Sequence, residues 1–189
     1  VPESNAASGE GVFAHFTSDG PFAGAEDPRI FVFNDETYIL FNAPTTITIA
    51  ATGVHIQARK MFISRLADTE LGATSIITIE SLDTEISKNF VPIVTENTVF
   101  LVISIEPFEL CELSFHVATF GTCKRKYLEK NYSRGTYANS IHGGSNTVAT
   151  ESGHLAVAHY FTRGIFGRLY IHKFVLFSNF FPHQPIWFS

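Results

Sequence analysis

The sequence predicts an all-β fold of the β-propeller type, and three observations support this expectation. Hydrophobic residues make up 45% of the 189 residues and charged residues only 16%, with 19 Phe, which indicates a core of Phe, Ile and Val. Residues of this kind favour strands, and no stretch shows sustained helical periodicity. A hairpin pattern recurs three times, at offsets of about 62 and about 55 residues, and a four-stranded unit with this period is typical of a propeller blade.

Each repeat contains two apolar strands joined by a polar turn. The three hairpins are expected at residues 26–41, 88–103 and 143–158, with turns at 34–36, 96–98 and 151–153. Further strands are predicted at residues 59–66, 75–80, 113–120 and 169–177. Hairpin units near 26–66, 75–120 and 140–187 therefore hold about four strands each.

We expect residues 1–189 to form a single partial propeller domain of about three blades. Propellers usually close with about 4 to 8 blades, so closure would need more chain or a second copy, and exposed edge strands favour association. A β-sandwich with similar hairpins is the alternative fold. Because the sequence starts at Val1, without an initiator Met or an apolar signal segment, it is a processed product or a piece of a longer protein.

The composition of the chain limits the classes of partner that it is expected to bind. The net charge of -5 argues against nucleic acid, and the one basic stretch, at residues 124–126, is interpreted as a solvated loop. No apolar run approaches the ~20 residues that cross a bilayer, so no membrane partner is expected. Cys111 and Cys123 could pair, and a glycosylation sequon begins at Asn131, but neither fixes the compartment, which stays open.

A dense cluster of charge precedes the first apolar strand. Glu26, Asp27 and Arg29 surround Pro28, which restricts the backbone of the residue before it. Charges beside an apolar strand must be paired, solvated in a pocket or used chemically, because unpaired burial is costly. The cluster is therefore a candidate site, and the alternative is an Asp-Pro turn with a local ion pair.

In a propeller, the first strands of successive blades end around one cavity. The positions that correspond to the charge cluster are Lys88 and Asn89 in the second repeat, and His142 with the pair Gly143 and Gly144 in the third. We expect acidic, basic and small residues to converge there.

Three motifs in this order resemble one known family. GAEDPR at residues 24–29, KNFVP at 88–92 and the Gly-Gly hairpin that runs from 143 to His159 are similar to motifs of the family 130 glycoside hydrolases and related β-1,2-mannosyltransferases. The resemblance implies a propeller of the five-bladed glycosidase type that acts on β-mannosides by inverting phosphorolysis, mannosyl transfer or hydrolysis. Asn89 stands where the family usually has Asp, and His142 where relatives often carry Arg.

The resemblance implies that Asp27 is the general acid. A general acid must carry a proton, and the neighbouring carboxylate Glu26, the second catalytic candidate, would favour its protonation. Residues two apart on a strand share a face, so Asp27 and Arg29 are expected on one side. The candidates for binding sugar or phosphate are Arg29, Lys88, Asn89, His142, His159, Tyr170 and His172.

No cofactor is expected beyond inorganic phosphate or a sugar phosphate as co-substrate, and the partner is an oligosaccharide. No histidine-based metal centre is expected, because the spacing of His154 and His159 puts them on opposite faces of a strand. Two other functions stay open: a non-catalytic glycan-binding propeller and an oligomerising scaffold.

Overall fold

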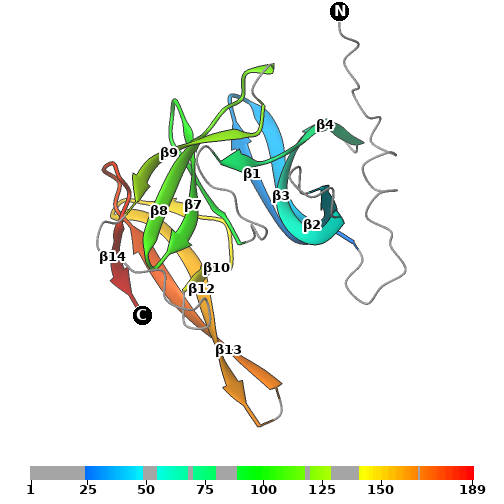
Figure 1. Ribbon diagram of the computed structural model, residues 1–189. Coiled ribbons are helices and arrows are strands. Elements are labelled where there is room, and N and C mark those ends of the chain that lie inside the picture. Colours follow the sequence, from blue (N-terminus) through cyan, green and yellow to red (C-terminus); the bar gives the residue numbers. More distant parts are fainter. Residues whose placement is uncertain are drawn as a thin grey trace, which may run out of the picture. The chain divides into compact units, whose positions relative to one another are not determined.

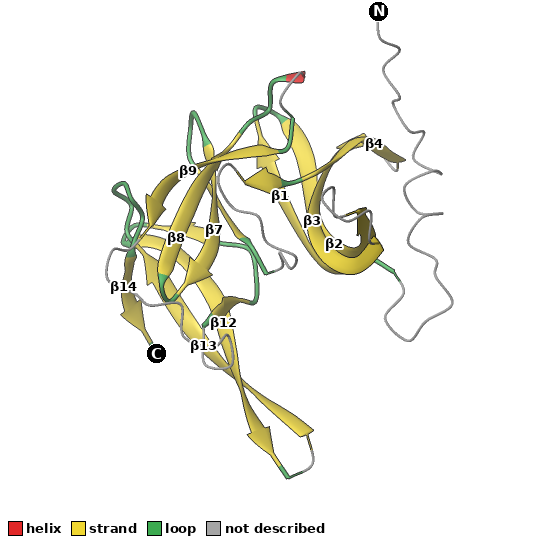
Figure 2. Cartoon of the chain, in the orientation of Figure 1, coloured by secondary structure: helices red, strands yellow, loops and turns green. Residues whose placement is uncertain are grey.

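The computed structural model describes residues 24–48, 55–67, 70–79, 89–117, 120–128, 141–165 and 167–189. Antiparallel strands dominate these residues and form three separate sheets (Figures 1 and 2). The chain divides into two compact units, the first formed by Val1–Thr78 and Leu82–Lys88 and the second by Ile79–Ser81 and Asn89–Ser189. The all-β class is confirmed, whereas a single propeller domain stays a prediction.

Unit 1 contains a four-stranded sheet in which neighbours in sequence are neighbours in space. Its strands are β1 (Glu26–Phe33), β2 (Glu36–Thr48), β3 (His55–Ala67) and β4 (Glu70–Ile76). Asn34 and Asp35 connect β1 to β2 with φ angles of 51° and 60°, as the tightest hairpin turns require. The first predicted hairpin is therefore confirmed, and the strand predicted at 59–66 lies within β3.

Burial alternates along the second half of β1. Phe31 and Phe33 are buried, while Ile30 and Val32 between them are exposed. On the buried face, Phe31 is directly opposite Tyr38 of the neighbouring strand β2, and their rings stack with centroids 5.6 Å apart. Residues 30–33 are all apolar, so the buried face of β1 is seen in the structure and not in the sequence pattern.

The first sheet of unit 2 has the order β5-β9-β8-β7-β6. Its strands are β5 (Thr78–Ile79, at the boundary between the units), β6 (Val91–Val94), β7 (Val99–Ile105), β8 (Phe108–Leu113) and β9 (Thr122–Leu128). The hairpin of β6 and β7 confirms the second repeat. The strand predicted at residues 113–120 is wrong, because β8 ends at Leu113 and Ser114 accepts a backbone bond from Gly121 across a turn.

The basic stretch at residues 124–126 is not a solvated loop, because it lies in β9. Nε of Arg125 lies 2.8 Å from Oε1 of Glu109, and Lys126 pairs with Glu112 on β8. A disulfide between Cys111 and Cys123, with Cα atoms 5.5 Å apart, joins the same two strands. Carboxylates on the neighbouring strand therefore hold basic residues that look solvated in the sequence.

The second sheet of unit 2 has the order β10-β12-β13-β14, with β11 paired to β12. Its strands are β10 (His142–Gly143), β11 (Val148–Thr150), β12 (Gly153–Gly164), β13 (Gly167–Phe177) and β14 (Pro185–Phe188). The turn between β11 and β12 falls at Glu151 and Ser152, which confirms the third predicted hairpin. The strand predicted at residues 169–177 lies within β13.

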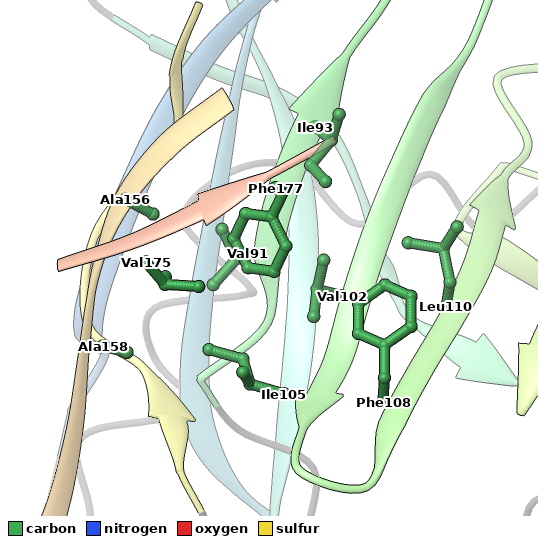
Figure 3. Packing of buried hydrophobic residues seen from close by; sticks show 10 residues of the cluster. All are labelled: Val91, Ile93, Val102, Ile105, Phe108, Leu110, Ala156, Ala158, Val175 and Phe177. Carbon is green, nitrogen blue, oxygen red and sulfur yellow. The ribbon is translucent and has the colours of Figure 1, made fainter. Parts of the chain in front are cut away.

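One hydrophobic core joins the two sheets of unit 2 (Figure 3). The first sheet contributes Val91, Ile93, Val102, Ile105, Phe108 and Leu110, and the second contributes Ala156, Ala158, Val175 and Phe177. At the edge of this core, a Cβ on Gly143 would lie 2.1 Å from Cγ2 of Val91 and 2.5 Å from the carbonyl oxygen of Asn89. The absence of a side chain at Gly143 therefore lets β10 approach the first sheet.

The three predicted hairpins lie in three separate antiparallel sheets of four or five strands. Closure of these sheets around a common axis stays a prediction. None of the described residues forms a helix of the length and hydrophobicity needed to span a bilayer.

Candidate functional site

The predicted site residues fall into two groups. Glu26, Asp27 and Arg29 lie on β1 of unit 1. Unit 2 carries Asn89, His142, His159, Tyr170 and His172, while Lys88 lies outside the described residues.

A bulge shapes the charge cluster on β1. Glu26 is paired with Asn42 and Arg29 with Leu40, so the register shifts between them, and Asp27 has a φ of 53°. An L-residue in this left-handed region costs about 1 kcal/mol, although Asp tolerates it better than most. Because of the bulge, Asp27 is exposed whereas Arg29 is only 4% exposed, so the expected alternation over these residues is wrong.

Hydrogen bonds from Asn42 and Arg29 hold both the side chain and the backbone of Asp27. Nδ2 of Asn42 donates to Oδ2 of Asp27 at 3.1 Å and to the carbonyl oxygen of Glu26 at 3.2 Å. Nη1 of Arg29 donates to the carbonyl oxygen of Asp27 at 2.9 Å. The Asp27 carboxylate is thus exposed and held in a defined direction, which suits a group that must meet a ligand.

The buried side chain of Arg29 contacts the backbone of the bulge. Burial lowers the pKa of Arg29, and the negative charge of Asp27 opposes this effect. Its guanidinium is directed to the backbone of Asp27, so the contact shown by the structure is a positioning one. Binding of phosphate by Arg29 stays a prediction.

Arg59 on β3 completes the cluster. Its Nη2 lies 2.8 Å from Oε1 of Glu26, and its Nη1 donates to Oδ1 of Asn42. The charge of Glu26 is therefore compensated, and Glu26 does not present to Asp27 the uncompensated negative charge that the sequence suggested. Of the two carboxylates, Glu26 is thus paired with a guanidinium, and Asp27 accepts a hydrogen bond from the Asn42 amide.

Sequence reasoning missed Asn42 and Arg59. The sequence did contain a signal for Asn42, because this residue interrupts the apolar run of residues 39–43. In the structure its side chain is 1% exposed. Polar groups buried in this way are normally hydrogen-bonded, which predicts a specific role. Arg59 lies on a different strand, 33 residues from Glu26, and carries no local signal.

Three histidines of unit 2 form a row across neighbouring strands. His142 on β10 is directly opposite His159 on β12, which is opposite His172 on β13. The ring centroids of each neighbouring pair are 6.0 Å apart, and the ring of Tyr170 lies 5.7 Å from that of His159. The structure thus brings these four predicted residues together.

Asn89 is placed differently. It has a φ of 64° and is buried, and its carbonyl oxygen faces Gly143. Within the described ranges, no group of three or more His, Cys, Asp or Glu side chains is arranged to hold a metal ion.

Comparison with known proteins supports the fold. No family model matches the sequence, and no curated protein is significantly similar to it. Among solved structures, the chain is similar to a glycosyl hydrolase from Bacteroides ovatus, with a TM-score of 0.52 and 14% identity over 87% of this chain and 51% of that one. The chain therefore has a fold like that of a glycosyl hydrolase and spans about half the length of that structure. Membership of family 130 stays a prediction.

Proposed function

We propose that this chain belongs to a carbohydrate-active enzyme that cleaves β-mannosides, with Asp27 as the general acid. The observation that carries the proposal is the exposed Asp27 carboxylate, which Asn42 and the bulge of β1 hold in one direction. The likeness to a glycosyl hydrolase supports the same class of reaction.

The proposed step transfers the proton of Asp27 to the glycosidic oxygen while the bond from that oxygen to the anomeric carbon breaks. The leaving sugar departs as an alcohol, and Asp27 is left as a carboxylate. A nucleophile attacks the anomeric carbon from the opposite face and inverts its configuration.

The environment of Glu26 favours phosphate as the nucleophile. Inverting hydrolysis needs a second carboxylate to take a proton from water, but Glu26 is already paired with Arg59. Phosphate carries its own negative charge and needs no such base. Mannosyl transfer and hydrolysis are the alternatives for the same general acid.

Substrate turnover tests the proposal. The chain is incubated with β-1,2-mannobiose, with and without inorganic phosphate, and mannose and mannose 1-phosphate are quantified. Wild type should release mannose 1-phosphate only when phosphate is present, and Asp27→Asn should lower the rate at least about 100-fold, because it removes the proton donor. Asp35→Asn is the matched control, since it makes the same change in the nearby turn, where Asn tolerates the positive φ.

Equal turnover by wild type and Asp27→Asn would refute the role of Asp27. Binding of mannobiose without any turnover would favour the non-catalytic glycan-binding protein. Neither binding nor turnover would favour the oligomerising scaffold. Thermal unfolding of both variants shows whether a lost rate reflects chemistry or folding.

A further inference from the structure

The sheet of β10 to β14 has a second face, turned away from the hydrophobic core of unit 2. Residues directly opposite on paired strands share a face, and the registers therefore define four rows. The histidine face comprises His142, His159 and His172 in one row, Phe161 and Tyr170 in the next, Val157 and Phe174 on the other side, and then Val148, Leu155, Leu176 and Trp187.

Rings on the histidine face form a continuous tract. His159 is its centre, with two imidazoles and Tyr170 around it. Tyr170 in turn lies 6.1 Å from Phe161, and the guanidinium carbon of Arg168 lies 4.9 Å above the Phe161 ring. Imidazole, aromatic and guanidinium groups thus follow one another over three adjacent rows, the third of which contains Arg168.

Three large aromatic side chains on this face are exposed. Tyr170 is 48% exposed, Phe174 52% and Trp187 49%. On the opposite face of the same strands, Val175 and Phe177 are completely buried (Figure 3). A contiguous exposed aromatic surface of this kind indicates a binding surface.

The charge of the sheet indicates the class of ligand. The five strands contain no Asp or Glu, although the whole chain has a net charge of -5. The histidine face carries His142, His159, His172 and Arg168, whereas His154 and Lys173 pair with Phe177 and Ala158 and lie on the core face. Arginine and protonated imidazole donate charge-assisted hydrogen bonds to carboxylate and sulfate groups.

We infer that the histidine face binds an oligosaccharide whose rings carry carboxylate or sulfate groups. The apolar faces of the sugar rings stack on Tyr170, Phe174 and Trp187, as flat apolar surfaces do on aromatic rings. The anionic groups bind at the histidine row and Arg168. The inference does not depend on the role proposed for Asp27.

A second copy of the chain fits this face less well. A symmetric dimer places the same patch on both sides of the interface. The histidines and Arg168 of one copy would then face those of the other, with no Asp or Glu from these strands between them. An anionic ligand would instead place negative charge opposite these groups.

Trp187 provides a direct assay, because it is the single Trp of the chain. Its fluorescence is followed during titration with a tetramer of galacturonic acid and with the fully methyl-esterified tetramer, which keeps the rings but loses the charge. We expect saturable binding of the acid form, and binding of the ester weaker by at least about tenfold. A sulfated tetrasaccharide in a parallel titration distinguishes sulfate from carboxylate as the preferred anion.

The effects of substitutions on binding locate the site. His172→Gln and Tyr170→Ala are exposed changes on the face, and each should weaken binding about tenfold. Lys124→Gln removes an exposed cation from the other sheet and should have no effect.

Several results would overturn the inference. Equal binding of acid and ester would remove the role of charge, and equal binding of a short DNA duplex would indicate unspecific attraction of polyanions. Failure of both acidic sugars to bind would exclude the site. A dimer in light scattering that Tyr170→Ala dissociates would show that a second copy covers the face.

Discussion

Gly143→Ala tests how the two sheets of unit 2 pack together. The new Cβ would lie 2.1 Å from Cγ2 of Val91 and 2.5 Å from the carbonyl oxygen of Asn89. Favourable carbon contacts need about 3.5 to 4.0 Å, so the sheets would have to separate by more than about 1 Å at this edge. Val91 belongs to the buried core and has no room to move away.

Overpacking of this kind costs about 1 to 3 kcal/mol, and a backbone atom as one of the obstacles favours the upper end. We expect Gly143→Ala to lower the free energy of unfolding by about 3 kcal/mol. With a urea m-value of about 2 kcal/mol/M, the unfolding midpoint would fall by about 1.5 M. The assay is urea unfolding followed by far-UV circular dichroism.

Gly144→Ala is the matched control. Its Cβ would meet the carbonyl oxygen of Val157 at 3.1 Å and Nδ1 of His159 at 3.3 Å, contacts that are tight but not prohibitive. A loss of no more than about 1 kcal/mol is expected. If Gly143→Ala were as stable as wild type, β10 could not lie against Val91, and the packing of the two sheets would be wrong.

Three further predictions concern stability. Asn42→Ala removes the amide that binds Asp27 and Arg59, and should lower the free energy of unfolding by about 2 kcal/mol in urea; an unchanged midpoint would show that this network does not hold the bulge. Replacing Cys111 and Cys123 with Ser opens a cross-link with a sequence separation of 12 and should cost about 3 kcal/mol; free thiols in the untreated protein would contradict the disulfide. Burial, together with the positive charge of nearby His183, lowers the pKa of His154, so the unfolded chain binds a proton more readily than the folded one. Stability should therefore be full above about pH 6.5 and fall at lower pH; His154→Gln should reduce this fall, and a flat pH profile in wild type would refute it.

The hairpins could be predicted because their signals are local. Polar turns at 34–36, 96–98 and 151–153 separate apolar runs, and each turn appears where the sequence placed it. The strand predicted at 113–120 failed because apolar residues in a loop resemble those of a strand. Residues 124–126 were misinterpreted because their partners, Glu109 and Glu112, lie on another strand.

The site was predictable only in part. A charged motif before an apolar strand identified Glu26, Asp27 and Arg29. The bulge, which leaves Asp27 exposed and Arg29 buried, depends on how β1 pairs with Asn42 and Leu40 of β2. Register over long distances brings His142, His159 and His172 into one row, although the sequence separates them by 30 residues. Such contacts depend on which strands become neighbours, which no local pattern reveals.

The configuration of the first product tests the proposed chemistry most directly. Proton NMR records which anomer forms when the chain acts on β-1,2-mannobiose with phosphate, before mutarotation or further reaction. If the reaction inverts the anomeric carbon and Asp27 is its general acid, wild type forms α-mannose 1-phosphate and Asp27→Asn forms none over the same time. A β-anomer, or equal formation of product by Asp27→Asn, would contradict it.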